Sequence, residues 1–74
     1  MKMKRIRTIY HEDHLKETLV QVDPEVYQAF VAADFCGFAM ATDEENVVSV
    51  ETLSTRDGSR WQDVLHDDIV ELTA

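Results

Sequence analysis

Alternating polar and apolar side chains at the start of the chain predict a β-hairpin. Residues 4–10, KRIRTIY, alternate charged or polar with apolar side chains and are rich in β-branched and aromatic types, which is typical of an amphipathic strand. The polar residues 11–14 interrupt this pattern. In residues 15–23 the β-branched side chains alternate as in a strand, whereas two leucines four positions apart would also suit a helix. Because this stretch ends in β-branched residues beside a strand, we expect a second strand here.

The clearest helical pattern covers residues 24–35. Asp23 is a favourable residue immediately before a helix, Pro24 suits the first helical position, and Glu25 places negative charge near the positive end of the helix dipole. At 100° per residue the apolar side chains of this segment gather on one face. Gly37 is expected to end the helix in a left-handed conformation.

The pattern in the second half of the chain predicts a further hairpin, followed by a segment that could be a helix or a strand. Residues 38–42 and 47–53 have strand patterns and flank an acidic turn at 43–46. Residues 59–66 suit a short helix, but they could also form the return strand of a hairpin after a tight turn. Residues 67–73 lose helical phase, which predicts a last short strand.

These patterns predict a single α+β domain over residues 1–74. One main helix, at about 24–35, packs on a small antiparallel sheet of four to five short strands, and a second short helix near 59–66 is the open alternative. A chain of 74 residues buries only roughly 60–65% of its unfolded surface, so its core is thin. With one cysteine it forms no internal disulfide, and a partner chain, such as a second copy in a homodimer, becomes an alternative source of stability.

The net charge of −8 comes from fifteen acids against seven Lys and Arg residues. The phosphate backbone of nucleic acids is recognised by clustered Lys and Arg, so this balance disfavours direct binding of nucleic acid. Two interpretations of the acidity stay open. It either keeps a small protein soluble, or it forms an electronegative surface that meets a basic partner.

Three further features predict a cytoplasmic protein with no membrane partner. No apolar run approaches the ~18 residues that a membrane span needs. The basic start is not followed by the apolar segment of a secretory signal. The unpaired cysteine fits a reducing compartment.

Candidate catalytic and metal-binding groups are few. Cys36 is expected at a helix C-terminus and beside Asp34, and both features disfavour the thiolate that a nucleophile needs. His11 and His14 would share one face of a helix and hold a metal ion, but no third ligand is identifiable. No glycine-rich phosphate loop or nucleophilic serine motif occurs. We therefore expect no enzyme, no cofactor and no metal, with the two histidines as the open question.

The acidic residues instead suggest a surface that binds a partner. The candidates lie on the predicted turn and along the C-terminal segment: Asp43, Glu44, Glu45, Asp63, Asp67, Asp68 and Glu71. Carboxylates a few residues apart can imitate the spacing of nucleic-acid phosphates and engage Arg and Lys through charge-assisted contacts. Phe35 and Trp61 are candidate aromatic anchors for such a partner, because interface energy concentrates in aromatic side chains. Core packing is the alternative for Trp61.

In size, acidity and lack of catalytic motifs, the chain resembles the small inhibitors encoded by phages and mobile elements, such as anti-CRISPR and DNA-mimic proteins. This resemblance implies a non-enzymatic protein that docks on a basic surface of a host protein or ribonucleoprotein and blocks DNA or RNA there. The alternative is a homodimeric interaction or assembly module whose acidity serves solubility alone.

Overall fold

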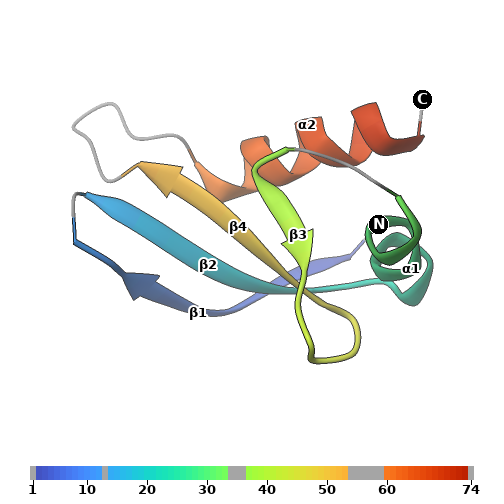
Figure 1. Ribbon diagram of the computed structural model, residues 1–74, viewed down its shortest axis with the longest axis horizontal. Helices are drawn as coiled ribbons and strands as arrows, with labels where there is room; N and C mark the ends of the chain where they lie inside the picture. The colour runs from blue at the N-terminus through green and yellow to red at the C-terminus, as the bar shows by residue number, and fades with distance from the viewer. Residues whose placement is uncertain (1, 13, 34–36, 54–59, 74) are drawn as a thin grey trace.

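The computed structural model describes residues 2–12, 14–33, 37–53 and 60–73 (Figure 1). Its elements along the chain are β1 (Met3–Tyr10), β2 (Leu15–Val22), α1 (Pro24–Ala32), β3 (Ala39–Ala41), β4 (Val47–Leu53) and α2 (Trp61–Thr73). The strands form one four-stranded antiparallel sheet in the order β1-β2-β4-β3. The predicted α+β class is therefore confirmed.

Both predicted hairpins are present. β1 pairs with β2 and β3 pairs with β4, each antiparallel, and β2 joins the two hairpins by pairing with β4. The β3–β4 turn places Asn46 at a φ of 65°, which asparagine tolerates better than most residues. The Thr42 N–H donates to the Val47 carbonyl over 3.0 Å and closes this turn. An irregularity between Arg5 and Arg7 interrupts the register of β1.

Helix α1 begins where the sequence predicts and ends earlier. Asp23 is extended (φ −62°, ψ 147°) and Pro24 opens the helix, although the Asp23 side chain makes no capping hydrogen bond. The last helical residue is Ala32, and Ala33 is already extended (φ −85°, ψ 141°). The predicted end at residue 35 is therefore wrong. So is the predicted left-handed Gly37, because no glycine among the described residues has a positive φ.

The main helix is α2 at the C-terminus, with 13 residues against 9 in α1. Residues 61–66 are helical, which resolves the open alternative, and the strand predicted for residues 67–73 is wrong. The physical reason is Asp68, which breaks the apolar pattern but is only 5% exposed. Its Oδ2 accepts hydrogen bonds of 2.8 Å from both the Phe38 and the Ala39 N–H. A polar residue can occupy an inward position when backbone donors satisfy it, and a search for apolar periodicity alone misses such a helix.

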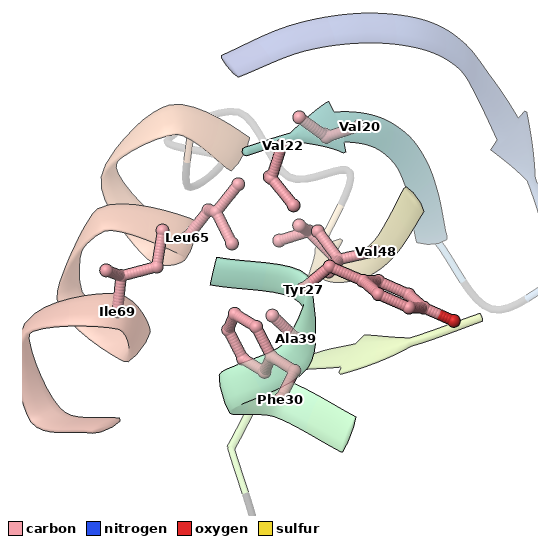
Figure 2. Close-up of a cluster of buried hydrophobic side chains, with 9 residues drawn as sticks. Val20, Val22, Tyr27, Phe30, Ala39, Val48, Leu65 and Ile69 are labelled. Carbon is pink, nitrogen blue, oxygen red and sulfur yellow. The ribbon is translucent and has the colours of Figure 1, made fainter. Parts of the chain in front are cut away.

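The two helices pack on the same face of the sheet and enclose one core. The buried apolar residues are Val20, Val22, Tyr27, Phe30, Ala39, Val48, Val50, Leu65 and Ile69. Figure 2 shows Leu65 and Ile69 of α2 directed toward the core residues of the sheet, with Phe30 of α1 beside them. The Tyr27 hydroxyl donates to the Thr42 carbonyl over 2.7 Å and ties α1 to the β3–β4 turn. In the described ranges no helix is long and apolar enough to cross a membrane.

Candidate functional site: a basic pocket and an acidic stripe

The helix-facing side of the sheet becomes polar toward β1 and toward the β1–β2 turn. The register aligns rows of side chains across the strands, and the row that contains Val20 and Val48 is apolar at its centre. The polar positions on the same side are Arg5, Thr8 and Tyr10 in β1, Lys16 and Thr18 in β2, and Thr52 in β4. A sheet built only to hold a core would carry apolar side chains at these positions. Their polarity marks this end of the sheet as a candidate site.

The start of α2 closes this region into a pocket of about 520 Å³. Trp61 and Gln62 of α2, and Arg60 immediately before the helix, line it opposite the polar sheet residues. We call this cavity the basic pocket, because Arg5, Lys16 and Arg60 supply three of the seven Lys and Arg residues of the chain. No carboxylate is among its described lining residues. A protein of net charge −8 thus has a locally positive cavity that suits an anion.

Two aromatic rings accompany the cations of the basic pocket. Tyr10 is exposed at the end of β1, and Trp61 is half-buried, packed at the edge of the core. Trp61 was predicted as an anchor for a basic partner, and the structure places it in the lining of the basic pocket. The other predicted anchor, Phe35, lies outside the described residues. Phe38, which the sequence suggests as part of the sheet, is 65% exposed.

The predicted acidic surface is only partly assembled. Asp63, Asp67 and Glu71 are four residues apart along α2, and all three are exposed. We call this row the acidic stripe. Successive carboxylates climb about 6 Å along the helix axis. None of the three forms an ion pair with another described residue, and α2 contains no Lys or Arg.

The other predicted acids do not extend the acidic stripe. Asp43, Glu44 and Glu45 are exposed on the β3–β4 turn, which projects away from α2 (Figure 1). The prediction that Asp68 belongs to an acidic surface is wrong, since its carboxylate is buried and occupied by two backbone donors.

A separate polar cluster lies on the face of the sheet away from the helices. The Ser49 hydroxyl donates to Glu17 Oε2 over 2.5 Å, and His11 Nε2 lies 3.1 Å from Glu17 Oε1. The hydrogen bond from Ser49 is the largest cause that lowers the pKa of Glu17 below its ordinary value of 4.5, followed by the contact with His11. Partial burial opposes this shift, and Arg7 adds a smaller attraction. The cluster therefore holds a carboxylate in its ionised form.

The metal hypothesis gains no support from this cluster. His11 turns toward Glu17, and His14 occupies a left-handed position (φ 62°) in the β1–β2 turn. Among the described ranges no group of three His, Cys, Asp or Glu side chains is arranged to hold an ion. Cys36 and Asp34 lie outside the part of the chain that the structure describes.

Sequence reasoning missed the basic pocket because its cations are far apart in the chain. A signal was present, since Lys16 and Thr18 alternate in phase with Val20 and Val22 and so were bound to share the core side of β2. The contribution of Arg60 depends on where α2 lies and had no local signal. No family model, curated protein or solved structure matches this chain, so its function has to be argued from these side chains.

Proposed function

We propose that this chain is a small non-enzymatic inhibitor that docks its acidic stripe on a basic, nucleic-acid-binding surface of a host protein. The observation that supports the proposal is the row of Asp63, Asp67 and Glu71, exposed and without cationic neighbours on α2. Bound in this way, the stripe occupies the Arg and Lys side chains that otherwise contact DNA or RNA phosphates.

The stripe suits this role because the helix holds it in a fixed arrangement. The opposite side of α2 is anchored in the core by Leu65 and Ile69, so the carboxylates need little ordering when they bind. Carboxylates accept charge-assisted and often bidentate hydrogen bonds from Arg. Their uncompensated charge also speeds the encounter with a positive surface, an effect that salt screens.

The test is an affinity capture from host lysate at low salt, followed by a competition assay with the captured protein. We expect a captured protein that binds nucleic acid and loses that binding in a mobility-shift assay when the chain is added. The triple variant Asp63→Asn, Asp67→Asn, Glu71→Gln should weaken capture by roughly tenfold or more.

The matched control neutralises three acids elsewhere, with Asp43→Asn, Glu44→Gln and Glu45→Gln, and should retain capture. If both triple variants weaken capture equally, the net charge of the chain determines binding and the position of the acidic stripe does not. A captured protein whose nucleic-acid binding is unaffected by the chain would refute inhibition.

A second candidate, a homodimeric interaction module, is favoured by the uncovered face of the sheet. In the described part of the chain both helices lie on the other side, and Met40 and Leu53 on the uncovered face are 64% and 55% exposed. Leu19 of β2 and Ile9 of β1, both half-buried, add apolar surface to the same face. Exposed apolar side chains that share one face are typical of an interaction surface.

A further inference from the structure

We propose that the basic pocket binds a phosphorylated nucleotide, either as a free mononucleotide or as the terminal nucleotide of a single strand. This proposal goes beyond the inhibitor function and does not depend on it, since it concerns a different surface with the opposite charge. Three properties of the pocket support it: its cations, its hydroxyl and amide donors, and its two rings.

The cations of the basic pocket have no carboxylate partner among the described residues. Arg5 and Lys16 lie on the helix-facing side of the sheet, where Arg5 is exposed and Lys16 is half-buried between Tyr10 and Thr52 in its row. Neither forms an ion pair with another described residue. Three like charges that line one pocket repel one another unless an anion lies between them. A bound phosphate would supply that anion.

Neutral donors in the pocket point to the same ligand. Thr52 is only 5% exposed, lines the pocket, and makes no side-chain hydrogen bond within the described residues. The first turn of α2, at Trp61 and Gln62, contributes backbone N–H groups and the positive end of a 13-residue helix. Cations from β1, from β2 and from the residue before α2, the Thr52 hydroxyl and a helix start together match the acceptor-rich surface of a phosphate.

The two rings account for a base attached to the phosphate. Tyr10 and Trp61 line the cavity beside the cations, and aromatic side chains of this kind stack with nucleobases of any sequence. A pocket of about 520 Å³ is in the range of small-molecule sites. An inorganic anion would leave both rings unused. A long polyanion would meet the acidic stripe, which starts at Asp63 directly after the pocket residues, so a mononucleotide or a strand end fits better than a duplex.

Trp61 is the only tryptophan in the chain and therefore reports directly on the pocket. Titration with adenosine 5′-monophosphate should quench its fluorescence in a saturable manner. Adenosine and inorganic phosphate should each bind at least about tenfold more weakly, since each lacks half of the contacts. A 5′-phosphorylated oligothymidine added in parallel distinguishes the two sources. Tighter binding of the oligonucleotide identifies a strand end, and tighter binding of the mononucleotide identifies a free nucleotide.

Arg5→Gln and Arg7→Gln form a matched pair of variants. Both remove one arginine from β1, but Arg5 lies on the pocket side of the sheet and Arg7 pairs with Leu19 on the uncovered face. Arg5→Gln should weaken binding of the preferred probe by about tenfold, and Arg7→Gln should leave it within about twofold. Lys16→Gln should act as Arg5→Gln does, and thermal melting of each variant checks that it is folded.

Three results would overturn the proposal. The first is the absence of saturable quenching by either nucleotide probe. The second is binding of inorganic phosphate as tight as that of the mononucleotide, which would make the pocket a simple anion site. The third is equal weakening by Arg5→Gln and Arg7→Gln, which would indicate attraction by net charge alone. None of these results bears on the acidic stripe, so the two proposals fail separately.

Discussion

At the scale of single residues, the best-defined polar group is the Glu17 carboxylate on the uncovered face of the sheet. It lies near the start of β2, flanked in its row by Ile9 and Glu51. The hydrogen bond from Ser49 and the contact with His11 stabilise its ionised form and lower its pKa. Since β2 and β4 are the central strands, the Glu17–Ser49 bond also links side chains across the middle of the sheet.

This bond predicts a specific dependence of stability on pH. The folded-state pKa of Glu17 is below its ordinary value of 4.5, so its contribution is complete above pH 4.5 and is lost as pH falls through the folded-state pKa. Ser49→Ala should raise the pKa of Glu17 toward 4.5, measured by NMR titration of the Glu17 side chain. It should also lower the free energy of unfolding at pH 7 by about 1–2 kcal/mol. Much of this loss should disappear in acid, and a pH-independent loss would contradict the assignment.

Asp68 shows what sequence can and cannot supply at the residue scale. The sequence identifies it as out of place in an apolar pattern, and this is correct. It does not reveal the backbone donors at Phe38 and Ala39, which are about thirty positions away and face Asp68 only in the folded chain. When these backbone donors are not known, an acidic residue at an inward position of a sequence pattern is interpreted as the end of the helix.

At the scale of elements, local patterns sufficed where neighbours along the chain also pair in space. Both hairpins follow from alternation and turn residues, and Val48, Val50 and Thr52 of β4 lie on its helix-facing side. Helix α2 required tertiary information, because its inward row contains Asp68. The start of α1 is coded locally by Asp23 and Pro24, whereas its end at Ala32 comes three residues before the predicted one.

The three-residue strand β3 is held to α2 by the hydrogen bonds to Asp68, so we expect substitution of Asp68 to destabilise the fold strongly. Asp68→Ala leaves the N–H groups of Phe38 and Ala39 without their acceptor, and Ala39 is only 2% exposed. We expect a loss of roughly 3 kcal/mol in the free energy of unfolding, measured by urea denaturation. Asp68→Asn keeps an acceptor oxygen and should lose less than half as much.

Asp67→Ala is the matched control for this variant, since Asp67 is the exposed neighbour of Asp68 on the same helix. It should change the free energy of unfolding by less than about 0.5 kcal/mol. If Asp67→Ala and Asp68→Ala are equally destabilising, the loss of stability comes from a general effect on helix α2 and not from the hydrogen bonds of Asp68 to β3.

At the scale of the whole molecule, charge is separated by element. The acidic stripe follows the outer side of α2, while the basic pocket lies under the start of the same helix and against β1. Composition predicts the sign of the total charge but not this separation, because the pocket gathers residue 5 of β1, residue 16 of β2 and residue 60 immediately before α2. A strongly acidic sequence can therefore still contain a site for an anion.

We predict that the uncovered face of the sheet binds a second copy of the chain. Lys4 and Arg7 lie on the β1 side of this face, whereas Glu17 and Glu51 lie on the central strands. A copy related by a two-fold axis can place the β1 cations of each chain against the central carboxylates of the other, with the apolar side chains between them. Sedimentation at increasing concentration should then show a species of twice the monomer mass.

Leu53→Glu should abolish this species, because it buries a charge in the apolar part of the contact. Val70→Glu is the matched control, since Val70 on α2 is 52% exposed, close to the 55% of Leu53, but lies on the helical side of the molecule. It should leave the dimer intact. A monomer at all concentrations, or equal loss of the dimer in both variants, would show that the uncovered face does not bind a second copy. Because Leu53 is remote from the acidic stripe in sequence and element, a dimer that survives the stripe variant but not Leu53→Glu would assign self-association and host binding to separate surfaces.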